Sequence, residues 1–85
     1  MNEIEIFCNN IRLLRRVYRL TQKDMAKVLG ISVHSLAKLE QGILPPHISS
    51  EVLIYINYCF GITPDRMFTV LTEDDLEEMR RNPPQ

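Results

Sequence analysis

Five residues between positions 33 and 41 carry groups that could recognise another molecule through hydrogen bonds and apolar contacts. At about 100° per residue, a helix through this segment would place them on one side. They are Val33, His34, Ala37, Lys38 and Gln41. That side offers an imidazole, an ammonium and an amide, which suit base edges or phosphates, and methyl groups, which suit thymine. A merely solvated helix face fits the same spacing equally well.

Two short helices joined by a glycine turn must position these groups. Thr21 is a typical N-cap for the first helix, with Asp24 in its first turn. Gly30 ends that helix, because glycine adopts the left-handed conformation at low cost. Ser32 caps the second helix, which stops at Gly42. The two leucines of the second helix fall opposite the five residues above and must face a core.

The N-terminal residues predict another helix, which runs to Arg19. Ile11 and Leu14 belong to a set of apolar residues that recur at helical spacing. The start of this helix lies near Ile4 or near Asn10. The acidic and apolar residues at its beginning also alternate, which suits a short extended arm. We favour the helix.

Three more helices are predicted after a loop at 43–47, where two prolines prevent a helix from continuing. Their caps are Ser49 or Ser50, Thr63 and Thr72. Gly61 closes the first of the three, and Pro64 suits the first position of the second. The first is expected in the core because of its apolar residues, which are Val52, Leu53, Ile56, Tyr58 and Phe60.

Together these elements predict an all-α fold, a compact bundle of five to six helices. We expect a single domain over residues 1–85. Its core spans about 9–71, and an acidic C-terminal helix and tail occupy 72–85. The chain is long enough for one modest hydrophobic core.

The formal net charge of -1 hides an uneven distribution. Residues 9–47 hold seven Lys and Arg against two acids, whereas residues 48–85 hold three against seven, and residues 1–8 hold two acids. Affinity for DNA comes largely from cations that neutralise phosphates. The positive middle of the chain is therefore the part suited to a polyanion.

The segment Thr21 to Gly42 resembles the helix-turn-helix of the phage repressor and Cro-like (XRE-type) family of DNA-binding domains. The family pattern runs Thr-Gln, apolar-Ala, Gly, Ser, two apolar residues, then Glu and Gly, and this segment matches it in register. The resemblance covers about 9–71. It implies a lambda-repressor-like bundle that binds double-stranded DNA sequence-specifically, regulates transcription and inserts helix 33–41 into the major groove.

The resemblance also implies roles for individual residues. Base contacts are expected from Ser32, Val33, His34 and Lys38. Phosphate contacts are expected from Gln22, Lys23 and Gln41, and from Arg12, Arg16 and Arg19 on the first helix. Gln22 would also brace the first reader residue. Arg15 and Glu40 are expected to form a buried structural ion pair.

Two features depart from the family pattern. Val33 stands where the family commonly has Gln or Arg, so it offers a thymine methyl contact and no bidentate hydrogen bond. Weaker base discrimination is therefore expected. The stretch from Gly42 to Gly61 is also longer than in the family, so the loop at 45–47 is extended.

Other reactive or aromatic residues are assigned to structure. His47 is taken as a surface loop residue, with a phosphate contact as the alternative. Cys8 and Cys59 are taken as reduced, partly buried thiols. Core packing is favoured over a platform for single-stranded nucleic acid at four aromatic positions. These are Tyr55, Tyr58, Phe60 and Phe68.

The sequence contains no pattern typical of a catalytic site, a phosphate-binding glycine loop or a metal-ligand cluster. We therefore expect no enzyme, no metal, no cofactor and no small-molecule effector. No segment approaches the roughly 20 apolar residues that span a bilayer. We expect a cytoplasmic protein that associates with the nucleoid when it binds DNA and makes no contact with a membrane.

A homodimer is expected, because one reader helix covers only a few base pairs. Candidate dimer residues in the last two helices are Met67, Val70, Leu71, Leu76 and Met79. The alternative function is a protein-interaction or antitoxin-like module on the same scaffold, with weak or no DNA binding. Its acidic C-terminal segment would then bind a basic surface.

Overall fold

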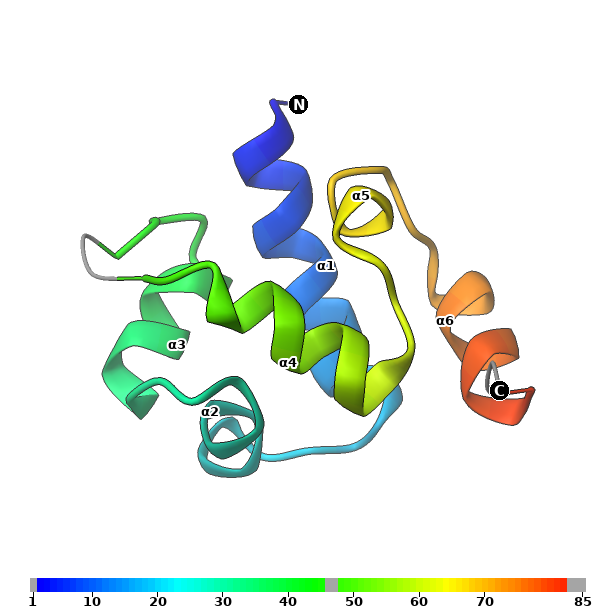
Figure 1. The fold of residues 1–85 in the computed structure, drawn as a ribbon, viewed down its shortest axis with the longest axis horizontal. Helices are drawn as coiled ribbons and strands as arrows, with labels where there is room; N and C mark the ends of the chain where they lie inside the picture. The colour runs from blue at the N-terminus through cyan, green and yellow to red at the C-terminus, as the bar shows by residue number, and fades with distance from the viewer. Residues whose placement is uncertain (1, 46–47, 83–85) are drawn as a thin grey trace.

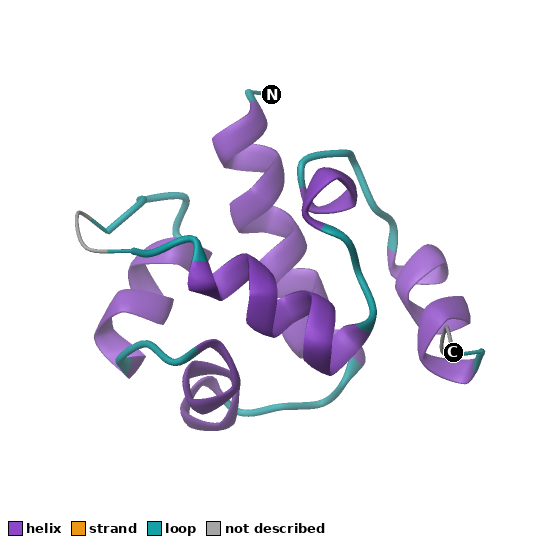
Figure 2. Ribbon diagram, viewed as in Figure 1, coloured by secondary structure: helices purple, strands orange, loops and turns teal. Residues whose placement is uncertain are grey.

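The computed structural model describes residues 2–45 and 48–82, and these form helices and no strand (Figure 1 and Figure 2). The helices are α1 (Glu3–Val17), α2 (Gln22–Leu29), α3 (Val33–Glu40), α4 (Glu51–Phe60), α5 (Pro64–Met67) and α6 (Glu73–Arg81). The prediction of an all-α bundle is confirmed. The predicted surface position of His47 lies outside the described residues.

The N-terminal residues are helical and do not form an extended arm. The side chain of Asn2 accepts a hydrogen bond of 2.8 Å from the backbone N–H of Glu5, which caps α1 at its start. The helix ends at Val17, before the predicted end at Arg19. Arg19 itself has a φ of 56°, the left-handed conformation that glycine adopts more easily.

The core forms where the helices turn their apolar sides together. In Figure 1, α3 lies to the left of α4 and α2 below it, whereas α5 lies above its right-hand end and α6 to its right. Residues from all six helices are almost completely buried, among them Ile11, Leu14, Met25, Leu29, Leu36, Leu39, Ile56, Met67 and Leu76. Asn10 is buried as well, and its amide donates to the carbonyls of Met67 and Thr69 at 2.9 and 2.8 Å. These two bonds fix the end of α5 against α1.

Only one side of α4 faces the core. Val52, Ile56 and Phe60 are buried, whereas Ile54 is 62% exposed and Tyr58 is 88% exposed. The prediction that Tyr58 and Tyr55 pack in the core is therefore wrong. Residues four apart share a side of a helix, and a residue two positions away lies about 200° from them. An apolar residue at every position does not reveal which side is buried.

The last two helices do not offer the predicted dimer surface. Met67, Leu71 and Leu76 are buried within the chain, and Met79 packs partly against the same core. α5 packs on α1 and α4, and α6 packs on α1, which accounts for this burial. Of the five candidates, Val70 alone is strongly exposed, at 67%.

Candidate nucleic-acid interface

Local capping bonds build the α2, turn and α3 unit. Thr21 Oγ1 accepts from the backbone N–H of Asp24 at 3.0 Å, and Ser32 Oγ accepts from the backbone N–H of Ser35 at 3.0 Å. Gly30 between the helices has a φ of 70°. Each of these features satisfies backbone groups that a helix end leaves without partners. The chain therefore turns sharply and enters α3 at a fixed angle.

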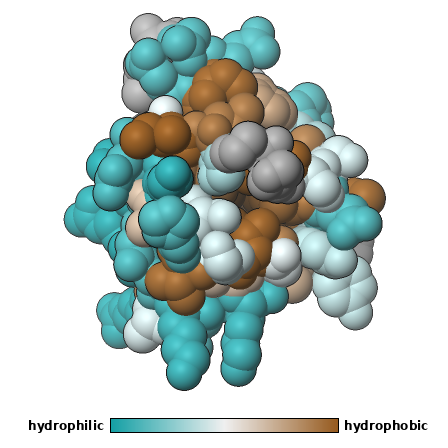
Figure 3. All heavy atoms as spheres, turned by 90° about the vertical axis from the view of Figure 1, so that its left-hand side faces the viewer, coloured by the Kyte–Doolittle hydropathy of each residue, from teal (hydrophilic) through white to brown (hydrophobic). Residues whose placement is uncertain are grey.

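α3 holds its position through two buried leucines and exposes the side opposite them. Leu36 and Leu39 are inaccessible to solvent. Val33, His34 and Gln41 are exposed, whereas Ala37 and Lys38 are half-buried. Figure 3 shows the left-hand side of Figure 1, where α3 lies, and there hydrophilic side chains surround smaller apolar patches.

An ion pair fastens α3 to α1. Arg15 Nε and Nη2 donate to the two carboxylate oxygens of Glu40 at 2.6 and 2.9 Å, and Arg15 Nη1 donates to the carbonyl of Leu20 at 3.1 Å. The Glu40 side chain is only 7% exposed. Such a two-point pair fixes orientation as well as distance. The ion pair expected between Arg15 and Glu40 is thus present, and it orients the C-terminal end of α3.

Gln22 joins the same network. Its Nε2 donates to Glu40 Oε1 at 3.2 Å, and its side chain is half-buried. The sequence assigned Gln22 to a phosphate and to bracing Val33. In the structure its amide adds a donor to the Glu40 carboxylate, and its contact with a phosphate stays a prediction.

The cationic residues divide between two sides of the molecule. Lys23 is exposed on α2, and Arg12 is exposed on α1, where it donates to Asn9 at 2.6 Å. Arg16 lies 3.7 Å from the carboxylate of Glu73 on α6. Arg19 lines the same depression between α1 and α6. Because α6 lies on the side of Figure 1 opposite α3, Arg16 and Arg19 face acids away from the exposed side of α3.

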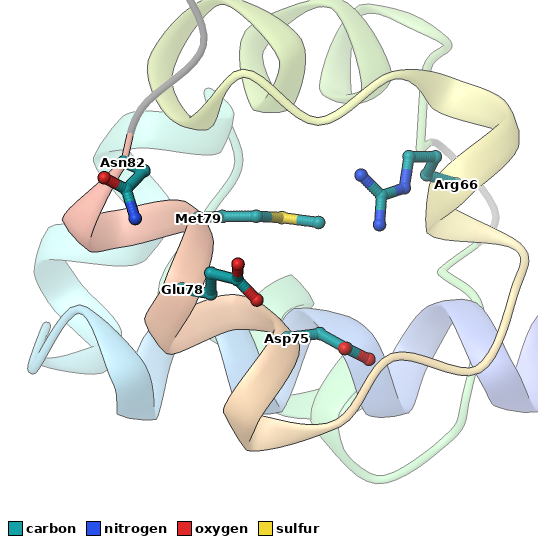
Figure 4. A pocket seen from close by; sticks show the side chains of 5 residues that line it. All are labelled: Arg66, Asp75, Glu78, Met79 and Asn82. Carbon is teal, nitrogen blue, oxygen red and sulfur yellow. The ribbon is translucent and has the colours of Figure 1, made fainter.

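A polar pocket between α5 and α6 was not predicted from the sequence. Figure 4 shows Arg66 on one side and Asp75 and Glu78 on the other, with Met79 and Asn82 completing a space of about 270 Å³. The backbone N–H of Thr72 donates to Asp75 at 3.0 Å, and hydrogen bonds from Thr72 lower the pKa of Asp75. Asp75 therefore serves the capping box that starts α6.

The two thiols differ in accessibility. Cys8 is buried, which raises its pKa, whereas Cys59 is exposed and was wrongly predicted to be partly buried. Within residues 2–45 and 48–82, no group of three His, Cys, Asp or Glu is placed to hold a metal ion. None of the helices in this part of the chain is long and apolar enough to cross a membrane.

Comparison with known proteins identifies a relative of this chain. The chain is 33% identical over 67 residues to an uncharacterized HTH-type transcriptional regulator of Methanocaldococcus jannaschii. The match covers 79% of this chain and 96% of the relative. No family model matches the chain, and no solved structure matches it significantly.

Proposed function

Because the chain belongs to the family of HTH-type transcriptional regulators, we propose that it binds double-stranded DNA and regulates transcription with α3 in the major groove. The observation that carries this proposal is the orientation of α3. Its leucines are buried and its outer side presents Val33, His34 and Gln41 to solvent. A helix held in this way is the usual means of reading base edges. We further assign the domain to the phage repressor and Cro-like type, on the residues from Thr21 to Gly42.

Base contacts in this proposal come from the N-terminal part of α3. His34 can donate or accept a hydrogen bond, and Lys38 donates from one turn later. Val33 supplies a thymine methyl contact, and Ser32 lies at the edge of the site. The Arg15 and Glu40 pair holds α3 at the required angle from behind.

Phosphate contacts come from residues that flank α3. Lys23 at the start of α2 and Gln41 at the end of α3 are exposed, and Arg12 supplies a further cation on α1. Arg16 and Arg19 are left out, because they face the acids of α6. With so few cations, two copies on adjacent half-sites about one helical turn apart would bind far better than one.

A salt titration tests this proposal. Binding to random and to selected duplex DNA is followed by fluorescence anisotropy from about 50 mM salt upward, since each lost phosphate contact lowers the salt slope by about one unit. We expect Arg12→Ala to lower the slope, and Arg81→Ala on α6 to leave it unchanged. The double variant with His34→Ala and Lys38→Ala should lose preference for the selected duplex. If the wild type binds no better at about 50 mM salt than an acidic control protein, the proposal fails.

The contact between Arg16 and Glu73 favours a second candidate, a protein-interaction or antitoxin-like module that binds DNA weakly or not at all. In this case the acids of α6 mask the cations of α1. Truncation of α6 would remove the buried Leu76 and uncover the core that it packs against, so substitution is the better test. Glu73→Gln with Glu77→Gln is compared with Glu3→Gln and Asp65→Asn, which change the net charge equally. Tighter DNA binding only in the α6 variant supports masking, whereas equal effects show a general charge effect.

A further inference from the structure

The outer side of α4 is apolar and has no partner in the described chain. Setting Ile54 at zero on a helical wheel, Tyr58 lies at about 40°, Glu51 at about 60° and Tyr55 at about 100°. Ile54 and Tyr58 are 62% and 88% exposed. The buried residues of α4 fall on the opposite arc. Contiguous exposed apolar surface of this kind marks an interaction site more often than chance exposure.

The charge of this surface selects its occupant. Glu51 is the only Asp, Glu, Lys or Arg between Gln41 and Pro64. DNA would find no cation on α4, and a strongly basic protein would find a single carboxylate, whereas a second copy of the same surface would pair apolar with apolar. We propose that α4 is the self-association surface of this chain, through Ile54 and Tyr58. The inference deepens the proposed function by naming the contact that joins the two copies, but it does not require DNA.

Glu51 also selects the direction of the pairing. In a two-fold pair of parallel α4 helices, Glu51 would lie beside the partner's Glu51 and like charges would repel. In an antiparallel pair centred on Ile54, Tyr58 lies opposite the partner's Ser50 and close to the partner's Glu51. A tyrosine hydroxyl can then donate to that carboxylate. Within its own chain Glu51 accepts a long hydrogen bond of 3.4 Å from the Tyr55 hydroxyl, so the antiparallel arrangement gives the one charge on this surface a second donor.

A groove beside the N-terminal half of α4 completes the fit. The groove encloses about 180 Å³ of mostly apolar space. It is lined by Ile4, Phe7, Leu44 and Phe68, together with Ser50 just before α4 and Leu53 within it. In the antiparallel pair each Tyr58 lies over the edge of the partner's groove. Because the contact is isologous, the same packing occurs twice. α3 is a separate surface to the left of α4 in Figure 1 and stays free for another ligand.

Analytical ultracentrifugation without DNA tests the surface. We expect the wild type to reach twice the mass of one chain at micromolar concentration, and Tyr58→Glu to weaken association about tenfold or more, as loss of a central tyrosine does. Ile54→Lys should act similarly. Circular dichroism should show unchanged helicity, because both side chains are exposed. Val70→Glu is the matched control at a strongly exposed apolar residue outside α4 and should associate as the wild type does.

Two results would overturn the proposal that α4 is the self-association surface. One is a wild type that remains monomeric at all micromolar concentrations. The other is Val70→Glu becoming monomeric while Tyr58→Glu does not. Since no DNA is present, either result leaves the DNA titration to decide the proposed function separately.

Oxidative crosslinking tests whether the two α4 helices of the pair run antiparallel. Cys59 lies five residues from Ile54, so two antiparallel copies hold their Cys59 residues about 15 Å apart, beyond the reach of a disulfide. We expect no crosslinked dimer from the wild type. Ile54→Cys in a Cys59→Ser background places two thiols at the two-fold axis and should crosslink. A disulfide through Cys59 but not through position 54 would overturn the antiparallel arrangement.

Discussion

Both α3 and α4 bury an apolar side, but the sides that they expose to solvent differ in chemistry. Leu36 and Leu39 anchor α3, and Val52 and Ile56 anchor α4. The outer side of α3 carries His34 and Gln41, and a buried ion pair fixes its end, whereas the outer side of α4 carries Ile54 and is nearly free of charge. Polar groups on a fixed frame suit the reading of a polar ligand, and an uncharged apolar side suits a like surface. The difference supports the proposal of two partners for two helices of one small bundle.

The largest expected loss of stability comes from removing the ion pair that holds α3. In Glu40→Gln, Arg15 loses its buried counter-charge, and loss of one partner of such a pair costs about 3 to 5 kcal/mol. Urea denaturation measures the change in the free energy of unfolding. The exposed pair of Arg16 and Glu73 is the control, since Glu73→Gln should cost less than about 1 kcal/mol. Equal costs in the two variants would show that the buried pair does not hold α3.

The next effect compares the two sides of α4 directly. Ile56→Ala empties a fully buried position and should cost about 2 to 5 kcal/mol, whereas Ile54→Ala on the exposed side should leave the monomer unchanged within about 0.5 kcal/mol. Unfolding is measured at low concentration, so that association does not contribute. A large loss in Ile54→Ala would mean that its side chain packs within the chain.

The sequence predicts the parts of this molecule that depend on neighbouring residues. Thr21, Gly30 and Ser32 define the α2, turn and α3 unit because caps and a left-handed glycine act within a few residues. The pairing of Arg15 with Glu40 came from family resemblance, since nothing local joins residues 25 positions apart.

Other features depend on tertiary packing and could not be read in this way. The outward position of Tyr58 depends on which arc of an apolar helix meets α2 and α5. The partner of Gln22 was missed because an amide can donate to several acceptors, and only the fold brings Glu40 within 3.2 Å. The contact of Arg16 with Glu73 likewise depends on α6 folding back onto α1.

A smaller effect tests how α4 supports the turn before α3. A Cβ on Gly30 would lie 3.0 Å from Tyr55 Cε2, in a backbone with φ +70°, whereas a Cβ on Gly42 would meet nothing within 4 Å at φ +86°. Both alanine variants bear the left-handed cost of about 1 to 2 kcal/mol. Gly30→Ala should therefore lower the melting temperature more than Gly42→Ala does. Equal shifts would show that the Tyr55 ring moves aside freely.

The smallest effect concerns Arg19, which lies on neither surface. The backbone N–H of Arg19 donates to the carbonyl of Arg16 at 3.1 Å, and the backbone N–H of Leu20 donates to the carbonyl of Arg15 at 3.0 Å. Helices that end with these two hydrogen bonds usually have glycine at the left-handed position, which Arg19 occupies here. Arg19→Gly removes the strain at φ 56° and should stabilise the fold by about 1 kcal/mol, as thermal unfolding would show. The salt slope of DNA binding and the mass in ultracentrifugation should both stay unchanged, because Arg19 faces α6. A lower salt slope would instead place the α6 side of α1 in contact with DNA, and the division of partners between α3 and α4 would then have to include it.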